Sequence, residues 1–158
     1  MTTYHVIGDV HGYAAQLREL LNALGWRQPS PREEPYRWIP PAGAQAIFVG
    51  DLVNRGPDNL GVLCTAMQMA RDGYAHMVLG NHDVRAIEML RGQLGLENPP
   101  KLALGRLMTW VELLGLGRVE KRAMLAFLES RPLFLELDEG RLLVTHAHWS
   151  ERFRRLDG

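Results

Sequence analysis

Four short segments of the sequence carry residue types that bind metal ions. They are residues 8–12 (GDVHG), 50–56 (GDLVNRG), 80–83 (GNHD) and 145–148 (THAH). Three of the four begin with a glycine, which permits a tight turn and lets a metal ion or a phosphate approach the backbone. Carboxylate, amide and imidazole groups together suit borderline divalent metals such as manganese, iron or zinc better than a cysteine-based zinc site. The segments therefore predict a metal-binding site.

The residues that precede and follow these segments predict the framework that must position them. Short apolar runs alternate with helical patterns, which is typical of an α/β layered fold. The predicted buried strands are residues 4–7, 46–49 and 76–79, and the predicted helices that follow them are residues 13–24, about 59–71, and 83–90. The first helix should bury one face formed by Leu17, Leu20, Leu21 and Leu24. Two consecutive strand-helix-strand crossovers result.

The remaining sequence predicts a loop, two further helices and a hairpin. Residues 28–43 are rich in proline and charged residues, which predicts a surface loop. Its aromatic residues, Tyr36 and Trp38, could pack beneath the loop or line the entrance to a substrate site, and we favour packing. Residues 91–100 break the helical pattern. Helices are then predicted at about 102–114 and 120–130, and an antiparallel hairpin at 133–137 and 141–145.

Because open α/β sheets bind ligands beyond the carboxyl ends of their strands, the four segments should meet at one edge. Asp9, Asp51, Asn81 and His146 would then converge although they lie far apart in the sequence. Two metal ions ~3.5 to 4 Å apart can activate a water and stabilise the entering and leaving oxygens of a phosphoryl transfer. A shared carboxylate is the natural bridge between such ions.

Composition gives the broad class of the protein. The 158 residues are most simply one domain, residues 1–158, and 18 basic residues balance 18 acidic ones. Net charge thus offers no argument for nucleic-acid or membrane binding. The single cysteine, Cys64, excludes an internal disulfide and is expected to be a buried structural thiol. No run approaches the ~18 apolar residues of a membrane span, so a cytoplasmic protein is expected.

The three glycine-led segments, in this order behind three strands, resemble the phosphoprotein phosphatase branch of the calcineurin-like metallophosphoesterases. Within it, the chain is most similar to bacterial members: diadenosine tetraphosphatases, Ser/Thr phosphatase-type enzymes and the phosphatase module of polynucleotide kinase-phosphatase. The resemblance spans residues 4 to about 92 and resumes at the hairpin and His146. It implies an αββα sandwich, with two sheets inside and helices outside.

The resemblance also implies roles for individual residues. Asp9 and His11 would bind one metal, Asp51 would bridge to a second, and Asn81 and His146 would complete the second. Two divalent ions, manganese foremost, would hold a bridging hydroxide that attacks phosphorus in line.

The same resemblance implies that two side chains contact the substrate. Arg55 would grip the phosphate oxygens with its planar fork of donors. His82 would be the general acid that protonates the leaving oxygen.

Structural roles compete with these assignments. Asp9, Asp51 or Asp83 could each accept hydrogen bonds from backbone amides near a helix start. An isolated histidine such as His82 or His146 is usually a hydrogen-bonded core residue, and Arg55 could be an ordinary surface arginine. The positions of these residues in the motifs favour the functional interpretation. His5 and His76 have no motif and are interpreted as structural.

Asn54 stands where the family usually has an aspartate that pairs with the residue matching His82. An aspartate would accept the imidazole proton and favour the charged ring, whereas Asn54 can accept through its side-chain oxygen without adding charge. We therefore expect His82 to be protonated less often near neutral pH, and acid catalysis to be impaired rather than abolished.

The family also supplies a further metal-binding histidine and a second phosphate-binding arginine beyond the point that corresponds to Gly158. His148 could complete the second metal's ligands only if no turn separates it from His146. The sandwich is expected to be incomplete at its C-terminal side, which fits either part of a longer chain or a homodimer.

These observations predict a metal-dependent phosphatase. Phosphoserine or phosphothreonine, a dinucleoside polyphosphate, and a phosphate at a nucleic-acid end are all open as substrates, and the neutral composition argues against the last. The alternatives are a catalytically impaired metal- and phosphate-binding module, or a fragment that folds without function.

Overall fold

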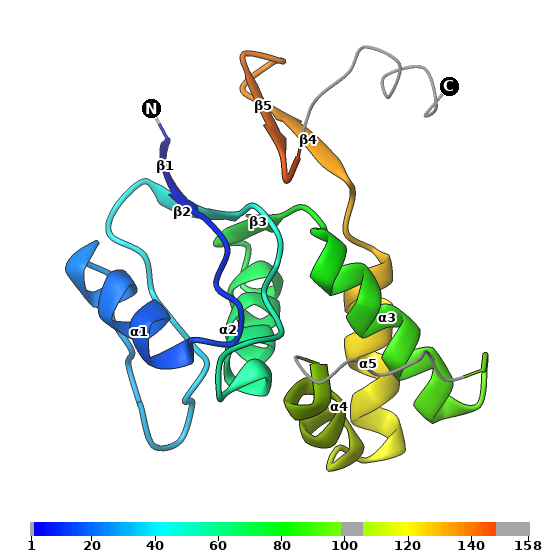
Figure 1. Cartoon of the computed structure of the whole chain (residues 1–158). Helices are drawn as coiled ribbons and strands as arrows, with labels where there is room; N and C mark the ends of the chain where they lie inside the picture. Colours follow the sequence, from blue (N-terminus) through cyan, green and yellow to red (C-terminus); the bar gives the residue numbers. More distant parts are fainter. Residues whose placement is uncertain (1, 99–105, 148–158) are drawn as a thin grey trace.

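The structure is a computed structural model that describes residues 2–98 and 106–147. Helices and strands alternate through the first half of the chain, and a hairpin follows the last helix (Figure 1). In chain order the elements are β1 (Thr3–Ile7), α1 (Ala14–Ala23), β2 (Ala44–Phe48), α2 (Asn59–Arg71), β3 (Ala75–Met77), α3 (Asn81–Leu94), α4 (Leu107–Leu114), α5 (Arg118–Glu129), β4 (Phe134–Leu137) and β5 (Leu142–Thr145).

The first three strands form a parallel sheet in the order β1-β2-β3. Ile7 pairs with Phe48 at the end of β1, and Phe48 pairs with Met77 at the end of β2. The helices α1 and α2 connect consecutive parallel strands, which confirms the two predicted crossovers. All three strands therefore point the same way, and the segments that follow them leave the sheet at one edge.

The two faces of this sheet pack against different partners. Ala46 and Phe48 belong to the main core with the helices, whereas Ile47 packs with Val78 and with Val144 of β5 in a second cluster. This alternation follows from the period of two of a β-strand. Figure 1 accordingly shows the helices on one side of the sheet and the β4-β5 hairpin on the other. Helix, sheet and second-sheet layers of the expected sandwich are thus present in the described residues.

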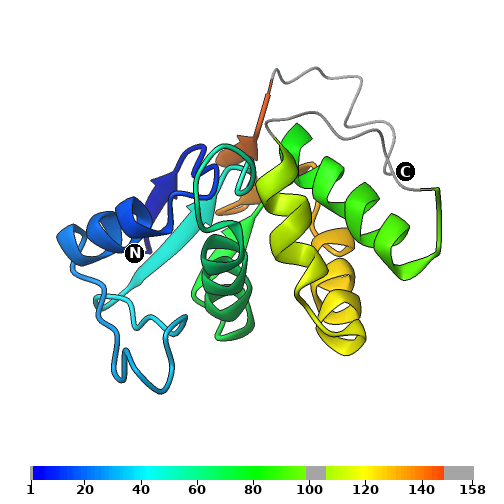
Figure 2. The same cartoon turned by 60° about the horizontal axis from the view of Figure 1, so that its bottom comes forward.

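Helix α4 lies against both α2 and α3 (Figure 2). It therefore reaches the loop that connects β2 to α2, although some fifty residues separate the two in the sequence. None of the helices in the described residues combines the length and the apolar composition that a membrane span requires.

Helix α3 is longer than the sequence pattern predicts. It begins at Asn81 rather than at residue 83 and continues through Gly92 to Leu94, so the predicted break at residue 91 is wrong. Gly92 is tolerated because Leu90 and Leu94, on either side of it, are buried and hold the last turn. The helix ends at Gly95, whose φ of 72° is the left-handed conformation of a typical C-terminal cap. Residues 102–105 of the next predicted helix lie outside the described residues.

Four side chains refine the predicted core. Trp38 is fully buried as expected, but Tyr36 is 38% exposed and does not pack under the loop as Trp38 does. In α1, Leu20 is 41% exposed because it lies at the edge of the buried face. Cys64 packs partly buried against the core, and burial raises the pKa of its thiol, as suits a structural residue.

Candidate metal centre

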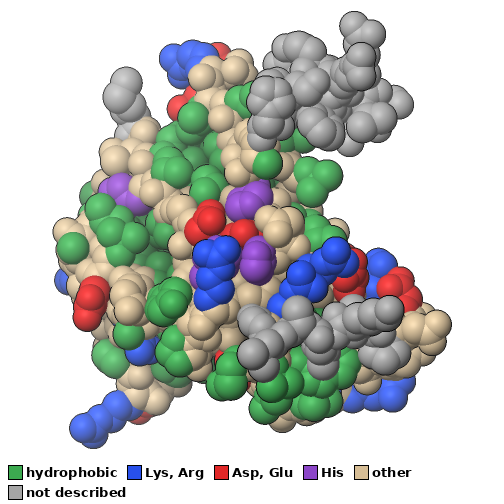
Figure 3. All heavy atoms as spheres, viewed as in Figure 1, with side chains coloured by type: hydrophobic (Ala, Val, Ile, Leu, Met, Phe, Trp, Pro, Cys, Tyr) green, Lys and Arg blue, Asp and Glu red, His purple; other side chains and the backbone are tan. Residues whose placement is uncertain are grey.

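The four segments meet at the carboxyl ends of the strands. On the face seen in Figure 3, acidic, basic and histidine side chains gather at one place between apolar areas. His11, Asp51 and His82 each offer a ligand atom, and these atoms lie within 4.8 Å of one another. The predicted convergence of separate segments is therefore seen.

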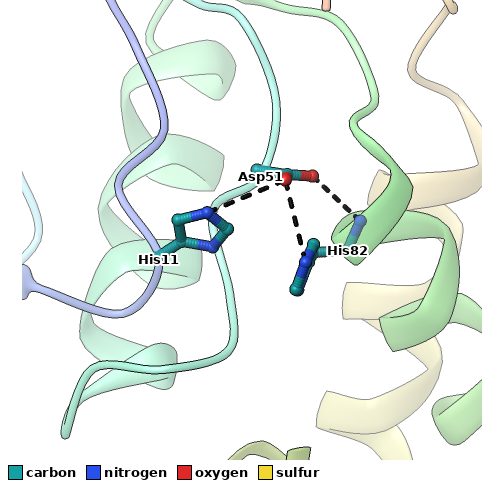
Figure 4. Close-up of side chains that lie close together, drawn as sticks. All are labelled: His11, Asp51 and His82. Carbon is teal, nitrogen blue, oxygen red and sulfur yellow. Dashed lines mark hydrogen bonds and ion pairs between the residues drawn. The ribbon is translucent and has the colours of Figure 1, made fainter. Parts of the chain in front are cut away.

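Asp51 lies at the middle of this group and is only 4% exposed. Its Oδ2 is 3.8 Å from Nε2 of His11 and 4.0 Å from Nε2 of His82 (Figure 4). Its Oδ1 is 3.6 Å from Nε2 of His146 and accepts a hydrogen bond from the backbone N–H of His82. One carboxylate thus faces three imidazole rings that come from three different segments.

A second buried carboxylate, that of Asp83, holds the backbone around Asp51. Asp83 accepts hydrogen bonds from the backbone N–H groups of Gly80, Asp51 and Leu52, at 2.9, 2.7 and 2.9 Å. Burial raises the pKa of Asp83 to about 6, because loss of water outweighs the three N–H donors. Asp83 therefore has the amide-binding role that the sequence left open.

The loop and helix start are packed too closely for a side chain at Gly80. A Cβ there would collide with the side chain and the backbone nitrogen of Asp51. The glycine is needed so that the start of α3 can approach the end of β2.

Several residues of the centre have left-handed backbone conformations. The φ angles of His11, Asp51, Asn54 and Arg55 are 48°, 54°, 71° and 85°. Such angles are unfavourable for residues other than glycine, and they occur where function or tight packing over-determines the backbone. The backbone of the two loops that carry the centre is therefore strained at these residues, unlike the backbone of the neighbouring helices and strands.

The three histidines differ in what their Nδ1 atoms contact. Nδ1 of His11 lies 3.0 Å from the carbonyl oxygen of Val53, and Nδ1 of His146 lies 2.8 Å from that of Val49. A carbonyl only accepts, so both Nδ1 atoms donate, and the neutral form of each ring presents the lone pair of Nε2 to the centre. Hydrogen bonding of one ring nitrogen to a carbonyl is the usual arrangement of a metal-binding histidine.

Nδ1 of His82 contacts a hydrogen-bond donor rather than an acceptor. Its Nδ1 lies 2.9 Å from Nδ2 of Asn54, and Oδ1 of Asn54 accepts a hydrogen bond of 2.8 Å from the hydroxyl of Thr109. The amide nitrogen donates, so Nδ1 of His82 is the acceptor and Nε2 carries the proton. This corrects the expectation that the side-chain oxygen of Asn54 accepts from the imidazole, because Thr109 already occupies that oxygen.

The pKa of His82 is lowered. Burial is the main cause, the charges of His11, Arg55 and Arg106 add to it, and the carboxylate of Asp51 opposes it. The direction is the one expected from the missing aspartate at position 54, although burial contributes most. A neutral ring is therefore favoured.

The other predicted site residues within the described part of the chain are more exposed to solvent. Asp9 is half exposed, with Oδ2 3.5 Å from Nε2 of His11. Asn81 is the exposed first residue of α3, and Arg55 is exposed beside Asn54. His148 lies outside the described residues.

The two histidines without a motif have structural contacts. Nε1 of Trp26 donates to Nδ1 of His5, and Nε2 of His76 contacts Oε1 of Gln45. Both interactions agree with the structural interpretation of these rings.

Sequence reasoning missed the residues of α4 and α2 that support the centre. Thr109 and Glu112 are three residues apart; Thr109 contacts the loop that follows β2, and Glu112 contacts the first residues of α2. Glu112 accepts from the backbone N–H of Leu60 and from Nδ2 of Asn59, whose Oδ1 accepts from the backbone N–H of Asn54. Thr109 and Glu112 are polar residues at helical spacing within the otherwise apolar residues 107–114. This spacing was the only sequence pattern that pointed to them.

The residues present fit a divalent metal site. Nε2 of His11 is buried and has no hydrogen-bond partner among the described residues, yet it faces the carboxylates of Asp9 and Asp51. A buried lone pair without a partner is costly unless a ligand satisfies it. A cation at this position would satisfy it and would also offset the charge of the two carboxylates.

Comparison with known proteins gives the class. Residues 2–155 match the family described as calcineurin-like phosphoesterase. The chain belongs to this family.

Curated relatives give a narrower similarity. The chain is 34% identical over 143 residues to a symmetrical bis(5'-nucleosyl)-tetraphosphatase of Ralstonia nicotianae, covering 90% of this chain and 41% of the relative. It is 32% identical over 148 residues to the asymmetrical bis(5'-nucleosyl)-tetraphosphatase PrpE of Halalkalibacterium halodurans, covering 91% of this chain and 56% of the relative. The chain thus spans about half the length of these relatives.

A solved structure agrees with them. A crystal structure described as that of a proposed diadenosine tetraphosphatase superposes with a TM-score of 0.57 at 25% identity, covering 92% of this chain and 50% of that one. Its likeness extends the family assignment to the three-dimensional fold.

Proposed function

We propose that the protein is a metal-dependent phosphoesterase that hydrolyses a phosphoanhydride bond of a dinucleoside polyphosphate. The observation that carries the proposal is the contrast between the histidines around Asp51. His11 and His146 present Nε2 lone pairs, as metal ligands do, whereas His82 presents an N–H, as a donor to a leaving oxygen does.

Two divalent ions would be held by the ends of the strands. Asp9 and His11 would bind one, Asn81 and His146 the other, and Asp51 both. Such ions, when bound, supply the positive charge that activates water and stabilises the phosphoryl transition state. Manganese is the ion we favour, and the oxygen-rich donor set accepts iron or zinc as well.

The remaining side chains would orient the substrate. Arg55 is exposed, and its charge already acts on His82, so its guanidinium can hold the phosphate oxygens next to the ring. His82 would then contact the leaving oxygen opposite the attacking water. This in-line placement is what phosphoryl transfer requires from a protein.

The lowered pKa of His82, which favours the neutral ring, supports an anhydride substrate. An alkoxide that leaves from phosphoserine needs a proton, whereas a phosphate that leaves from an anhydride is stable as an anion because its own pKa is about 6. Asn54 adds no charge to favour a protonated ring, so a leaving group that needs no proton fits this site best. The names of the curated relatives support the same class of substrate.

A second candidate is a metal- and phosphate-binding module with impaired catalysis. The same Asn54 favours it, because the ring beside Asn54 is a poor proton donor. The two candidates differ in turnover of an anhydride.

Diadenosine tetraphosphate with Mn²⁺ separates the candidates. We expect nucleotide products by chromatography, their loss in Asp51→Asn, and slower release of phosphate from a phosphoserine peptide. Metal binding by the wild type without turnover of any of these substrates would favour the binding module. Faster hydrolysis of the phosphoserine peptide than of the anhydride would contradict the proposed substrate class.

A further inference from the structure

Thr109 is the one polar side chain through which α4 contacts the side chain of Asn54. It is only 1% exposed, and its hydroxyl donates to Oδ1 of Asn54 at 2.8 Å. The two residues are 55 positions apart in the sequence, so the contact depends on the packing of α4 against the loop. A buried hydroxyl that donates to a buried amide restricts what that amide can do elsewhere.

In the structure the hydroxyl of Thr109 donates to Oδ1, so Nδ2 is the end of the Asn54 amide that faces His82. The oxygen and nitrogen of an amide have nearly the same shape, so packing alone does not distinguish them. With Oδ1 bound to Thr109, Nδ2 is the atom that faces Nδ1 of His82, at 2.9 Å. The proton of the neutral ring then lies on Nε2, which is 4.0 Å from Oδ2 of Asp51 and inside the centre.

Further hydrogen bonds hold α4 against the first residues of α2, next to the loop. Oε1 and Oε2 of Glu112 accept from Nδ2 of Asn59 and the backbone N–H of Leu60, at 2.7 and 2.8 Å. Oδ1 of Asn59 accepts from the backbone N–H of Asn54 at 2.7 Å. Because this second contact also fixes the helix, loss of the Thr109 hydroxyl should leave α4 in place.

We propose that Thr109 is a positioning residue that fixes the amide of Asn54 and thereby the tautomer of His82. The catalytic consequence rests on the function proposed above. Neutral His82 would donate its Nε2–H as a hydrogen bond to the leaving oxygen and would keep that proton. Water forms the new P–O bond and releases its proton to solvent, while the anhydride P–O bond breaks and its electron pair leaves with the phosphate.

The tautomer can be measured directly. We would record the ¹⁵N shifts of Nδ1 and Nε2 of His82 in protein loaded with diamagnetic Zn²⁺ at about pH 8, where an ordinary imidazole is neutral, with the signals assigned by their loss in His82→Gln. We expect the Nε2–H tautomer in the wild type. An Nδ1–H tautomer in the wild type overturns the proposal without any variant.

Two variants test the part played by Thr109. Thr109→Val keeps the shape of the side chain but loses the hydroxyl, and we expect a mixture of tautomers. Thr109→Ser keeps the hydroxyl and should keep the wild-type shifts. An unchanged tautomer in a folded Thr109→Val protein overturns the proposal, as does a changed tautomer in Thr109→Ser.

Activity gives a separate readout. With diadenosine tetraphosphate, Thr109→Val should lower kcat about tenfold with little change in KM, as for loss of a group that orients another. Thr109→Ser should stay within about twofold of the wild type, because its hydroxyl is retained. If the wild type does not turn over, the proposed function fails while the NMR result still decides the role of Thr109.

Discussion

The carboxylate of Asp83 accepts a hydrogen bond of 2.7 Å from the backbone N–H of Asp51. It joins the start of α3 to the end of β2, and its other two bonds go to Gly80 and Leu52. Asp51 in turn accepts from the backbone N–H of His82. Two aspartates thus bind each other's backbone segments, and the position of the central carboxylate follows from this reciprocal pairing.

Asp83→Asn should destabilise the fold by about 3 kcal/mol, because the amide has one acceptor oxygen and places its NH₂ against buried N–H donors. Denaturant unfolding measures the change. Glu88→Gln is the matched control, since its partner Arg85 is exposed and the pair should contribute under about 1 kcal/mol. Equal stability of the two variants would show that the three hydrogen bonds of Asp83 do not hold the loop.

Removal of the His11 ring should remove metal. We expect His11→Ala to bind about one metal ion fewer per chain than the wild type by elemental analysis, because Nε2 of His11 is the buried lone pair that faces Asp9 and Asp51. His76→Ala removes a histidine that contacts Gln45 outside the centre and should leave the metal content unchanged. An unchanged content in His11→Ala would exclude His11 as a ligand.

Arg55→Ala should lower kcat/KM for the anhydride about a hundredfold, because a guanidinium aimed at the transferring phosphoryl group stabilises its charge. Steady-state kinetics measure this loss. Arg85→Ala, on the exposed side of α3, removes the same charge without facing His82 and should change kcat/KM little. Similar losses in both variants would mean that Arg55 acts only through the general field of the protein.

Asn54→Asp should restore a charged partner to His82. A carboxylate accepts from Nδ1 and raises the pKa of the ring, so a proton becomes available for a poor leaving group. We expect turnover of phenyl phosphate to rise by tenfold or more, since general acid catalysis contributes ~10²- to 10⁴-fold. Turnover of the anhydride, whose leaving group needs no proton, should change less. No gain with phenyl phosphate would refute this account of Asn54.

The sequence predicts those parts of the centre that are local in the chain. Asp51 and His11 follow apolar runs and glycines, so their strand ends and their convergence follow from the pattern alone. The αβ crossovers follow in the same way from alternating strands and helices. These features need no knowledge of how distant elements pack.

The rest depends on packing that no local pattern records. The orientation of the Asn54 amide is set by Thr109, which belongs to a helix that docks from 55 residues away. The extent of α3 is set by burial of Leu90 and Leu94, which outweighs the low helix propensity of Gly92. The local pattern predicts the position of His82, but its tautomer also depends on the packing of Thr109 against Asn54. The sequence alone therefore does not predict the tautomer.

His146 comes from the strand β5, whereas Asp51 follows β2 in the other sheet, and Nδ1 of His146 already contacts the backbone carbonyl of Val49. A cation between Nε2 of His146 and Asp51 would fasten the hairpin to the parallel sheet. Metal affinity and the docking of the two sheets are then thermodynamically linked, so that each strengthens the other. The metal centre would then stabilise the packing of the two sheets in addition to its role in catalysis.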